Sequence, residues 1–159
     1  MMNVIVAVDQ NWAIGKDGDQ LVYISEDLKH FKALTSGHTV ILGRKTLATF
    51  PRGRPLKGRR NLILSRNPGF APEGAEVFSD LDALLAVAPE DAFVIGGASV
   101  YQALLDRCDT AYVTKVQGTF SADCHLPDLD ARPDWRAVEE GPLQEDSGTC
   151  YRRATYRRI

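Results

Sequence analysis

The sequence comprises 159 residues, of which 44% are hydrophobic and 25% are charged. Its 19 basic residues nearly balance its 21 acidic ones, and a formal net charge of -2 gives no reason to expect a nucleic-acid surface. Three cysteines without a CxxC spacing favour neither a disulfide framework nor a zinc site, and no apolar run reaches the length of a membrane span. The N-terminal segment also lacks the features of a secretion signal, so we expect a cytoplasmic protein with a single domain over residues 1–159.

Short runs rich in Val and Ile predict β-strands along the chain. Most of these runs are continuous rather than alternating, which is typical of strands buried on both faces of a sheet. The predicted strands cover residues 4–8, 39–42, 61–64, 75–78, 92–95 and 111–116, followed by a segment around Trp135 and residues 151–159.

Helical patterns lie between several of these strands, and the third of them opens with a capping box formed by Ser79 and Asp82. The predicted helices are Ser25–Thr35, Lys45–Phe50, Ser79–Ala88 and Ser99–Asp106. This alternation predicts an α/β fold: a mixed, mostly parallel central sheet of about eight strands with flanking helices and a C-terminal antiparallel hairpin. Residues 15–19, 51–58 and 67–74 are expected to be loops that carry binding groups.

An acidic pair stands at the start of the first predicted helix. With Ser25 as N-cap, Glu26 and Asp27 fall in the first turn, where the helix dipole favours negative charge. At about 100° per residue, however, Asp27 shares a stripe with the apolar Phe31 and Leu34. A carboxylate on an apolar face needs a cationic or hydrogen-bonding partner. Spacing alone leaves two interpretations open, a solvated first-turn acid and a functional carboxylate.

Two segments combine a strand, glycine and a helix start. Residues 41–46 read Ile-Leu-Gly-Arg-Lys-Thr, and residues 93–101 read Phe-Val-Ile-Gly-Gly-Ala-Ser-Val-Tyr. Glycine lets a backbone approach a ligand closely, and free N–H groups at a helix start suit phosphate. A plain strand-to-helix turn remains the alternative for each segment. The second segment lacks the third glycine of the dinucleotide fingerprint.

Arginines at two strand ends suggest a further phosphate contact. Arg66 follows Ser65 at one strand end and Arg44 follows another, and together they could clamp a phosphate monoester, although a lone arginine of this kind is usually a surface residue. The three histidines have no metal-ligand spacing, so no metal site is predicted. Neither a nucleophile elbow nor a phosphate-binding Gly-Lys-Ser/Thr loop is present.

Taken together, and over nearly its full length, the chain resembles the dihydrofolate reductase family. Several motifs in the correct order are far more specific than any one of them. The resemblance rests on residues 6–9, 12–15, 26–32, 42–46, 58–61, 94–101, 112–114 and 125–128.

The resemblance implies reduction of 7,8-dihydrofolate to tetrahydrofolate by NADPH, in a monomer whose partner is the small-molecule substrate. It implies that Asp27 binds the 2-amino and N3 positions of the pterin and favours protonation of N5, with Thr114 as its hydrogen-bond partner. Arg59 would hold the α-carboxylate of the glutamate tail, and Arg44, Ser65 and Arg66 would surround the cofactor's 2′-phosphate. The implied substrate residues are Ile5, Ala7, Asp27, Phe31, Phe50, Leu56, Arg59, Ile95, Tyr101 and Thr114. The implied cofactor residues are Ala7, Ile14, Gly43, Arg44, Lys45, Thr46, Leu64, Ser65, Arg66, Gly96, Gly97, Ala98, Ser99, Val100 and Tyr101.

Further implications concern the backbone and the lid. Family members have a cis peptide at the position of Gly96-Gly97, and residues 9–24 are the candidate lid over the site. The chain departs from the family where Leu21-Val22 replaces a common Pro-Trp, where Ser25 replaces a common Pro, and where Gln20 replaces a frequent apolar residue. These departures concern the water network and the lid rather than Asp27.

Two alternatives remain beside this interpretation. One is the related reductase domain of riboflavin biosynthesis, which uses NADPH on a ribosylated pyrimidine. Asp27 on the helix face and Arg59 after Gly58 suit a pterin and a glutamate better. The other is a non-catalytic folate- or nucleotide-binding module, which would leave the carboxylate and the phosphate-binding groups together without a use.

Overall fold

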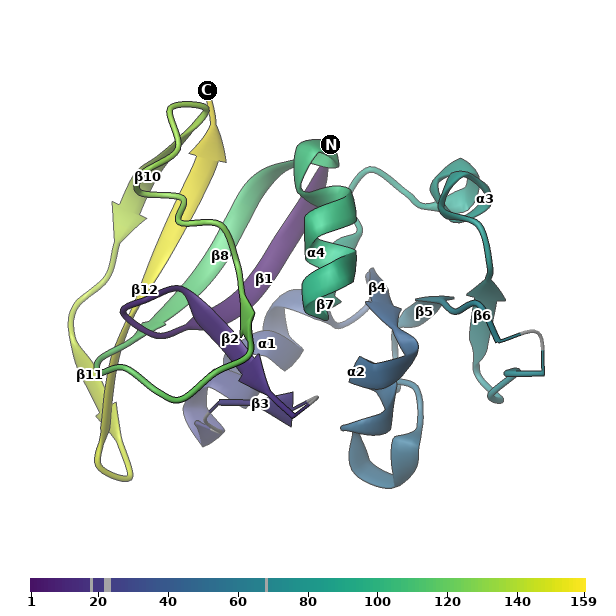
Figure 1. Cartoon of the computed structure of the whole chain (residues 1–159), viewed down its shortest axis with the longest axis horizontal. Coiled ribbons are helices and arrows are strands. Elements are labelled where there is room, and N and C mark those ends of the chain that lie inside the picture. The colour runs from purple at the N-terminus through teal and green to yellow at the C-terminus, as the bar shows by residue number, and fades with distance from the viewer. Residues whose placement is uncertain (18, 22–23, 68) are drawn as a thin grey trace.

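The computed structural model describes residues 1–17, 19–21, 24–67 and 69–159, and within them nine strands build one central sheet (Figure 1). These strands are β1 (Met2–Val8), β4 (Thr39–Gly43), β5 (Arg60–Leu64), β6 (Ala75–Phe78), β7 (Phe93–Gly96), β8 (Cys108–Val116), β10 (Trp135–Glu140), β11 (Gln144–Asp146) and β12 (Thr149–Arg158). Eight of them follow the order β10-β12-β8-β1-β7-β4-β5-β6, and β11 pairs with β12.

The sheet is mixed and mostly parallel, as the sequence predicts. All pairs from β8 through β1, β7, β4 and β5 to β6 are parallel. Strand β12 runs antiparallel to β8, β10 and β11, which confirms the C-terminal hairpin. Ser147 and Gly148 link β11 to β12 with positive φ angles of 53° and 85°, the backbone sense that suits a two-residue hairpin turn.

A small second sheet lies beside the central one. It contains β2 (Ala13–Lys16), β3 (Asp19–Gln20) and β9 (Cys124–His125), in the order β3-β2-β9. The prediction of a loop over residues 15–19 is therefore wrong where Gly15 pairs with Gln20 and Lys16 with Asp19. These strands are too short to show a hydrophobic period, so pairing alone defines them.

Four α-helices and two 3₁₀ turns occur in the described residues. The α-helices are α1 (Ser25–Thr35), α2 (Arg44–Ala48), α3 (Leu81–Val87) and α4 (Ala98–Leu104), and the turns are η1 (Pro51–Gly53) and η2 (Leu105–Arg107). The predicted capping box of Ser79 and Asp82 is wrong, because Asp80 is the N-cap of α3 and its carboxylate accepts a hydrogen bond from the Asp82 N–H. No helix of the described chain is long and apolar enough to cross a membrane.

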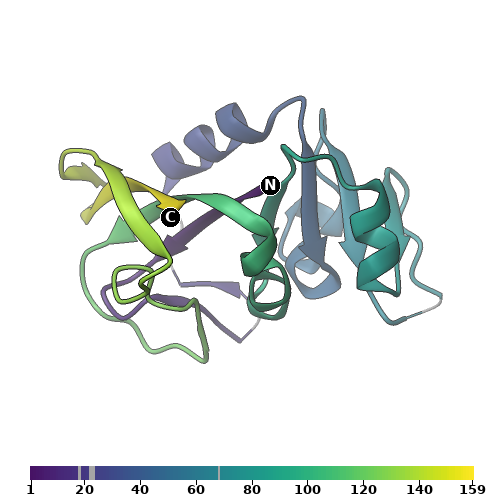
Figure 2. The same ribbon diagram turned by 90° about the horizontal axis from the view of Figure 1, so that it is seen from above.

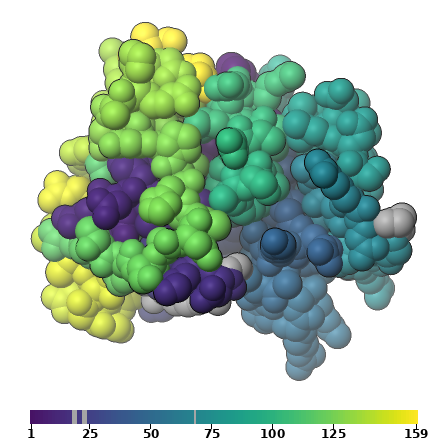
Figure 3. All heavy atoms as spheres, viewed as in Figure 1, coloured from purple at the N-terminus to yellow at the C-terminus, as the bar shows by residue number. Residues whose placement is uncertain are grey.

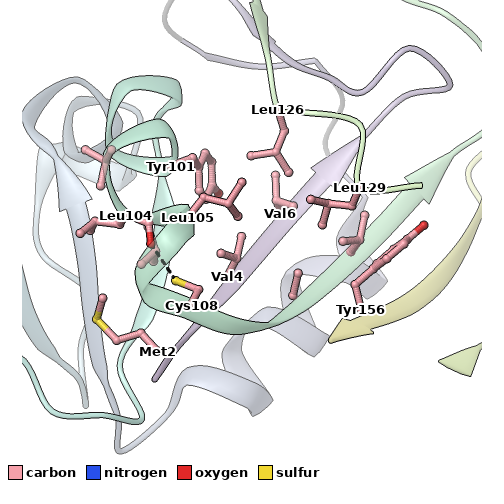
Figure 4. Packing of buried hydrophobic residues seen from close by; sticks show 14 of the residues in the cluster. Met2, Val4, Val6, Tyr101, Leu104, Leu105, Cys108, Leu126, Leu129 and Tyr156 are labelled. Carbon is pink, nitrogen blue, oxygen red and sulfur yellow. Dashed lines mark hydrogen bonds between the residues drawn. The ribbon is translucent and has the colours of Figure 1, made fainter. Parts of the chain in front are cut away.

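The central strands bury both faces in two separate cores. In β1, Val4 and Val6 pack with α4 and the C-terminal strands, whereas Ile5 packs in the second core with residues of α1 and α2. Figure 4 shows the first core, in which Val4 and Val6 face Leu104 and Leu105. Figure 2 shows α1 on the side of the sheet opposite α4. This alternation explains why the strands read as continuous apolar runs.

The start of α1 is held by a distant strand rather than by its own N-cap. The N-cap is Ile24, which makes no side-chain cap bond, so the assignment of Ser25 as N-cap is wrong. Instead, the Asp146 carboxylate of β11 accepts from the Ser25 hydroxyl at 2.9 Å and from the Glu26 N–H at 3.2 Å. These bonds lower the pKa of Asp146 below its ordinary value. The C-terminal hairpin thus fixes the helix turn that carries Asp27.

Replacing Asp146 with Ala is expected to lower the melting temperature at pH 7, because α1 loses its only carboxylate at the N–H groups of the first turn among the described residues. A carboxylate whose pKa is depressed in the folded state stabilises the fold at pH values above its unfolded-state pKa, about 3.9. It loses that effect as the pH falls through its folded-state pKa. The difference from wild type should therefore shrink below about pH 4. Thermal melts followed by circular dichroism at pH 7 and pH 3 measure it. Glu145→Ala, an exposed neighbour, is the control, and an equal loss in both variants would contradict the cap.

Candidate active site

A cleft of about 1490 Å³ lies where the parallel strands end, between the α1 side of the sheet and the segment containing α2. Figure 3 shows this face hollowed between the N-terminal and green segments on one side and the blue segment on the other. Every residue that the sequence implicates in the site lines this one cleft. These residues are Ile5, Ala7, Ile14, Asp27, Phe31, Gly43, Arg44, Lys45, Thr46, Phe50, Leu56, Arg59, Leu64, Ser65, Arg66, Ile95, Gly96, Gly97, Ala98, Ser99, Val100, Tyr101 and Thr114.

Asp27 lies at the edge of the cleft with its carboxylate turned toward the sheet. The helical stripe predicted from the sequence is present, since Asp27, Phe31 and Leu34 are half-buried, whereas Glu26 is exposed. The Thr114 hydroxyl of β8 donates a hydrogen bond to Asp27 Oδ1 at 2.6 Å. The Asp27 side chain keeps 22% of its surface accessible. One carboxylate oxygen is thus bonded to the protein, while the residue still lines the cleft.

The walls of the cleft next to Asp27 are apolar. Phe31, Phe50, Leu56 and Ile95 pack as partly buried side chains against the core that contains Ile5. Such a wall suits a flat aromatic ligand, whose polar edge then meets the carboxylate.

Arg59 is a half-buried cation in the same cleft. Its Nη1 donates to Thr35 Oγ1 at 3.0 Å and its Nε donates to the Lys57 carbonyl at 2.9 Å. Burial lowers the pKa of Arg59 from its ordinary value. Both acceptors are neutral, so the guanidinium is oriented but not neutralised by them, which leaves it suited to a carboxylate ligand.

Two adjacent strand ends bring the basic residues of the cleft together. Strands β4 and β5 are parallel neighbours in which Gly43 pairs with Leu64. The residues that follow, Arg44 on one strand and Ser65 and Arg66 on the other, therefore leave the sheet at the same level. Arg44 and Arg66 are exposed at the cleft, and Ser65 is buried with its hydroxyl accepting from the Asn67 N–H at 3.2 Å.

The glycines between β7 and α4 allow a close approach of two backbones. The Gly96-Gly97 peptide is cis, as the resemblance predicts. A Cβ added at either glycine would lie 3.2 Å from Thr46 Oγ1, and one added at Gly43 would lie 3.3 Å from Val100 Cγ2. Side chains at these positions would crowd α2 and α4, so glycine keeps this part of the cleft open to a ligand along the backbone.

Tyr101 lines the cleft but uses its hydroxyl within the protein. The hydroxyl donates to the Ile5 carbonyl at 2.8 Å, and only 5% of the residue is exposed. Burial raises the pKa of Tyr101 well above its ordinary value, so the phenol stays neutral. It joins α4 to β1, and what it offers a ligand is the ring rather than the hydroxyl.

The candidate lid, residues 9–24, is only partly described. Ile14, Gly15, Lys16, Gln20 and Leu21 line the cleft. Gly18, Val22 and Tyr23 lie outside the described residues, so the prediction about Leu21-Val22 cannot be followed beyond Leu21.

The N-terminal end of this segment is fixed by Asp9, a buried carboxylate that the sequence reasoning did not single out. Its Oδ1 accepts from the Asn11 and Ala13 N–H groups at 2.8 and 2.9 Å, and its Oδ2 accepts from the Phe120 N–H at 2.9 Å. Asp9 therefore ties the loop after β1 to the loop before β9. An acid directly after a buried strand was the available signal.

Sequence reasoning also missed Arg153, the other charged group at Asp27. Arg153 Nε lies 3.7 Å from Asp27 Oδ1. It belongs to β12, which the sequence predicts as a strand, but its position beside β8 depends on a pairing that no local pattern encodes.

Comparison with known proteins agrees with this geometry. The family profile described as dihydrofolate reductase matches residues 1–158. The dihydrofolate reductase of Bacillus subtilis is 39% identical over 155 residues, covering 95% of this chain and 90% of the relative. The type 3 dihydrofolate reductase of Salmonella typhimurium is also 39% identical, over 153 residues, covering 95% of this chain and 93% of the relative.

A solved structure shares the fold. Dihydrofolate reductase from Enterococcus faecalis, complexed with NADP(H) and RAB-propyl, superposes with a TM-score of 0.85 at 33% identity, covering 99% of this chain and 96% of that one. The comparisons give no support to a riboflavin-pathway reductase or to a non-catalytic binding module. On the profile match over residues 1–158 and the identity to these relatives, the chain belongs to the dihydrofolate reductase family.

Proposed function

We propose that this chain reduces 7,8-dihydrofolate to 5,6,7,8-tetrahydrofolate with NADPH as the reductant. The observation that carries the proposal is a single cleft with a carboxylate beside apolar walls at one part and two arginines at adjacent strand ends at another. The names of the relatives and the NADP(H) complex of the Enterococcus faecalis enzyme support it. Absorbance at 340 nm with dihydrofolate and NADPH tests it directly, and a wild-type protein without turnover would refute it.

Asp27 is the residue that recognises the pterin in this proposal. An ionised carboxylate accepts two hydrogen bonds from an amidine-like edge, which the 2-amino and N3 positions of the pterin present. The Thr114 hydroxyl at 2.6 Å holds Oδ1 in place, so the carboxylate is oriented before the substrate binds. Its negative charge also favours the protonated form of the bound pterin.

The rest of the substrate follows the cleft. Phe31, Ile95 and their apolar neighbours would hold the ring system by burial. Arg59, which the protein orients but does not neutralise, would hold the α-carboxylate of the glutamate tail.

The cofactor residues fit a phosphorylated dinucleotide. Gly43, Gly96 and Gly97 leave the backbone accessible, and Arg44 and Arg66 supply cations where β4 and β5 end. When bound, NADPH supplies the hydride that reduces C6 of dihydrofolate. The protein's tasks are to align the two ligands and to exclude bulk water, and Ile14 and Leu21 of the candidate lid line the cleft. The proton for N5 comes from water, and the negative charge of Asp27 favours protonation of N5.

We also propose that the chain forms one domain over residues 1–159, acts as a cytoplasmic monomer and does not bind nucleic acid. Among the described residues, its exposed large apolar side chains include Val87 of α3, Val138 of β10 and Leu143 between β10 and β11. Light scattering after size-exclusion chromatography measures the oligomeric state.

Asp27→Asn should lower kcat/KM for dihydrofolate at neutral pH by roughly 100-fold or more, because the amide keeps the shape but not the charge that favours protonation. The decay of absorbance at 340 nm measures the loss. Glu26→Gln is the matched control, since the exposed Glu26 side chain pairs only with Lys29 among the described residues. Normal turnover in Asp27→Asn would exclude the proposed role.

Arg44→Ala and Arg66→Ala should each reduce the preference for NADPH over NADH by roughly 10- to 100-fold, the effect expected from removing a charge-assisted hydrogen bond. The ratio of kcat/KM values for the two cofactors is the measurement. Arg136→Ala removes an exposed arginine of β10 and should leave the ratio unchanged. If the preference survives in both cleft variants, the 2′-phosphate is bound elsewhere.

Arg59→Ala should raise KM for dihydrofolate by roughly 10-fold or more while changing kcat little, because the contact is remote from the reacting atoms. Dihydropteroate, which has no glutamate tail, should be turned over equally well by the variant and the wild type. Arg54→Ala removes an exposed arginine from the same connection between η1 and β5, and serves as the control. A loss of equal size with both substrates would mean that Arg59 supports the pterin site instead.

A further inference from the structure

Arg153 lies directly behind the carboxylate of Asp27. In the antiparallel pair of β12 and β8, Arg153 is opposite Thr114, and in the parallel pair of β8 and β1, Thr114 is opposite Ala7. Register partners project to the same face of a sheet, here the face that α1 covers. Asp27 of α1 therefore meets a hydroxyl from β8 and a guanidinium from β12 side by side.

Both groups are directed at the same oxygen. Thr114 Oγ1 donates to Asp27 Oδ1 at 2.6 Å, and Arg153 Nε lies 3.7 Å from that atom. This Nε is buried and makes no hydrogen bond within the described residues. At 3.7 Å it is beyond hydrogen-bond distance, so the interaction with Asp27 is one of charge.

Other contacts keep the guanidinium in this place. Arg153 Nη2 donates to the Glu26 carbonyl in the first turn of α1 at 3.3 Å, and the guanidinium carbon lies 5.3 Å from the centre of the Tyr151 ring. Tyr151 is two residues earlier on the same strand, so its ring shares the face. The cation is thus held between a strand neighbour and the backbone of the helix that carries Asp27.

Arg153 does not belong to the ligand cleft. It lines a separate cavity of about 260 Å³, together with His30, Leu34, Tyr112, Glu139 and Thr155, whereas the large cleft has Asp27 but not Arg153 in its wall. Ile5 and Thr114 line both spaces and divide them. Arg153 can therefore affect a ligand only through Asp27 and through its field.

The field of Arg153 is only partly screened by water. The Arg153 and Asp27 side chains keep 25% and 22% of their surface exposed. Other titratable groups surround the pair: Glu26 and His30 from α1, Tyr112 from β8 and Glu139 from β10. Burial and then the charge of Arg153 lower the pKa of His30, while Asp27 opposes them. The charge of Arg153 thus also acts on His30, which lines the same small cavity.

We propose that Arg153 is a positioning residue. Its charge, acting through Asp27, lowers the midpoint of the pH–rate profile for hydride transfer. The inference rests on the proposed function. The reaction consumes NADPH, dihydrofolate and one proton, and forms NADP⁺ and tetrahydrofolate. A C–H bond of the dihydronicotinamide breaks as its hydride forms a C–H bond at C6, and the N5=C6 double bond becomes a single bond as N5 takes the proton. A fixed cation 3.7 Å from the carboxylate partly offsets its negative charge, and so disfavours a further positive charge on the bound pterin.

The direction of the effect follows from this charge balance. Hydride transfer slows as pH rises, because the protonated substrate becomes scarce. Without the guanidinium the site is more negative and retains the proton to a higher pH. Neutralising position 153 therefore moves the midpoint of the pH–rate profile upward and leaves hydride transfer faster than wild type on the alkaline side.

Single-turnover hydride transfer from NADPH to dihydrofolate, followed by stopped flow between pH 5 and pH 9, tests the proposal. Arg153→Met should raise the midpoint by about 0.5 to 1 pH unit, less than a fully buried pair would give because the groups are partly exposed. Arg153→Lys keeps the charge and should keep the wild-type midpoint. Arg152→Met removes a charge from the opposite face of the same strand, where Arg152 lies across from Lys115 of β8. It should leave the profile unchanged.

Two further variants exclude other causes. Arg153→Gln is neutral but polar, and should give the same upward shift if Arg153→Met does not fold. The shift should persist in a His30→Gln background; its disappearance there would assign the effect to His30 and overturn the proposal. A wild-type protein that transfers no hydride would refute the proposed function, whereas an active wild type with the same midpoint as both neutral variants would refute only the role of Arg153.

Discussion

The central strands of the sheet bury both of their faces, and this constraint decides where polar chemistry can be placed. Val4 and Val6 fill one core and Ile5 the other, so β1 has no side on which a charged group could stand along its length. At the middle of the sheet, the polar groups of the cleft therefore stand at the strand ends and on the helices that begin there, whereas Thr114 and Arg153 come from β8 and β12 at its side. The cleft lies at these ends, where Gly43, Leu64 and Gly96 close their strands.

Within that arrangement, Asp27 is a carboxylate that reaches the sheet from a helix. The Thr114 hydroxyl donates a hydrogen bond to Asp27 Oδ1. Arg153 places a positive charge behind the same oxygen without lining the cleft. Asp27 also lines the cleft, where its carboxylate can meet a substrate. The same separation appears at Arg59, which neutral acceptors orient while its charge is left for a ligand. The site is thus built from charges that the protein positions but does not fully neutralise.

Local patterns in the sequence predict the parts of this site that depend on local structure. The stripe of Asp27, Phe31 and Leu34 follows from helical periodicity, and the glycine and arginine positions follow from strand ends that the apolar runs mark clearly. The family resemblance adds the roles of Thr114 and Arg59, which no spacing argument reaches. All the implicated residues line one cleft, although their binding roles remain predictions until they are measured.

The features that the sequence predictions missed or placed wrongly have a common physical origin, because all of them depend on contacts between different segments of the chain. Ser25 has the composition of an N-cap, but Asp146 supplies the carboxylate, from a hairpin whose position depends on the whole sheet. Arg153 faces Asp27 only because β12 pairs with β8 in one register, and a shift of one residue would turn Arg152 to that face instead. Strands β2 and β3 are defined by pairing rather than by a hydrophobic period.

The position of β12 inside the sheet has a consequence for the order in which the site can be assembled during synthesis. This strand lies between β10 and β8, yet it is translated after both of them. A nascent chain that has emerged only as far as β8 can bring Thr114 to Asp27, but it has neither the guanidinium behind the carboxylate nor the Asp146 cap on α1. The electrostatic surroundings of the carboxylate are therefore completed only after translation has passed Arg153, long after the helix that carries Asp27 has left the ribosome.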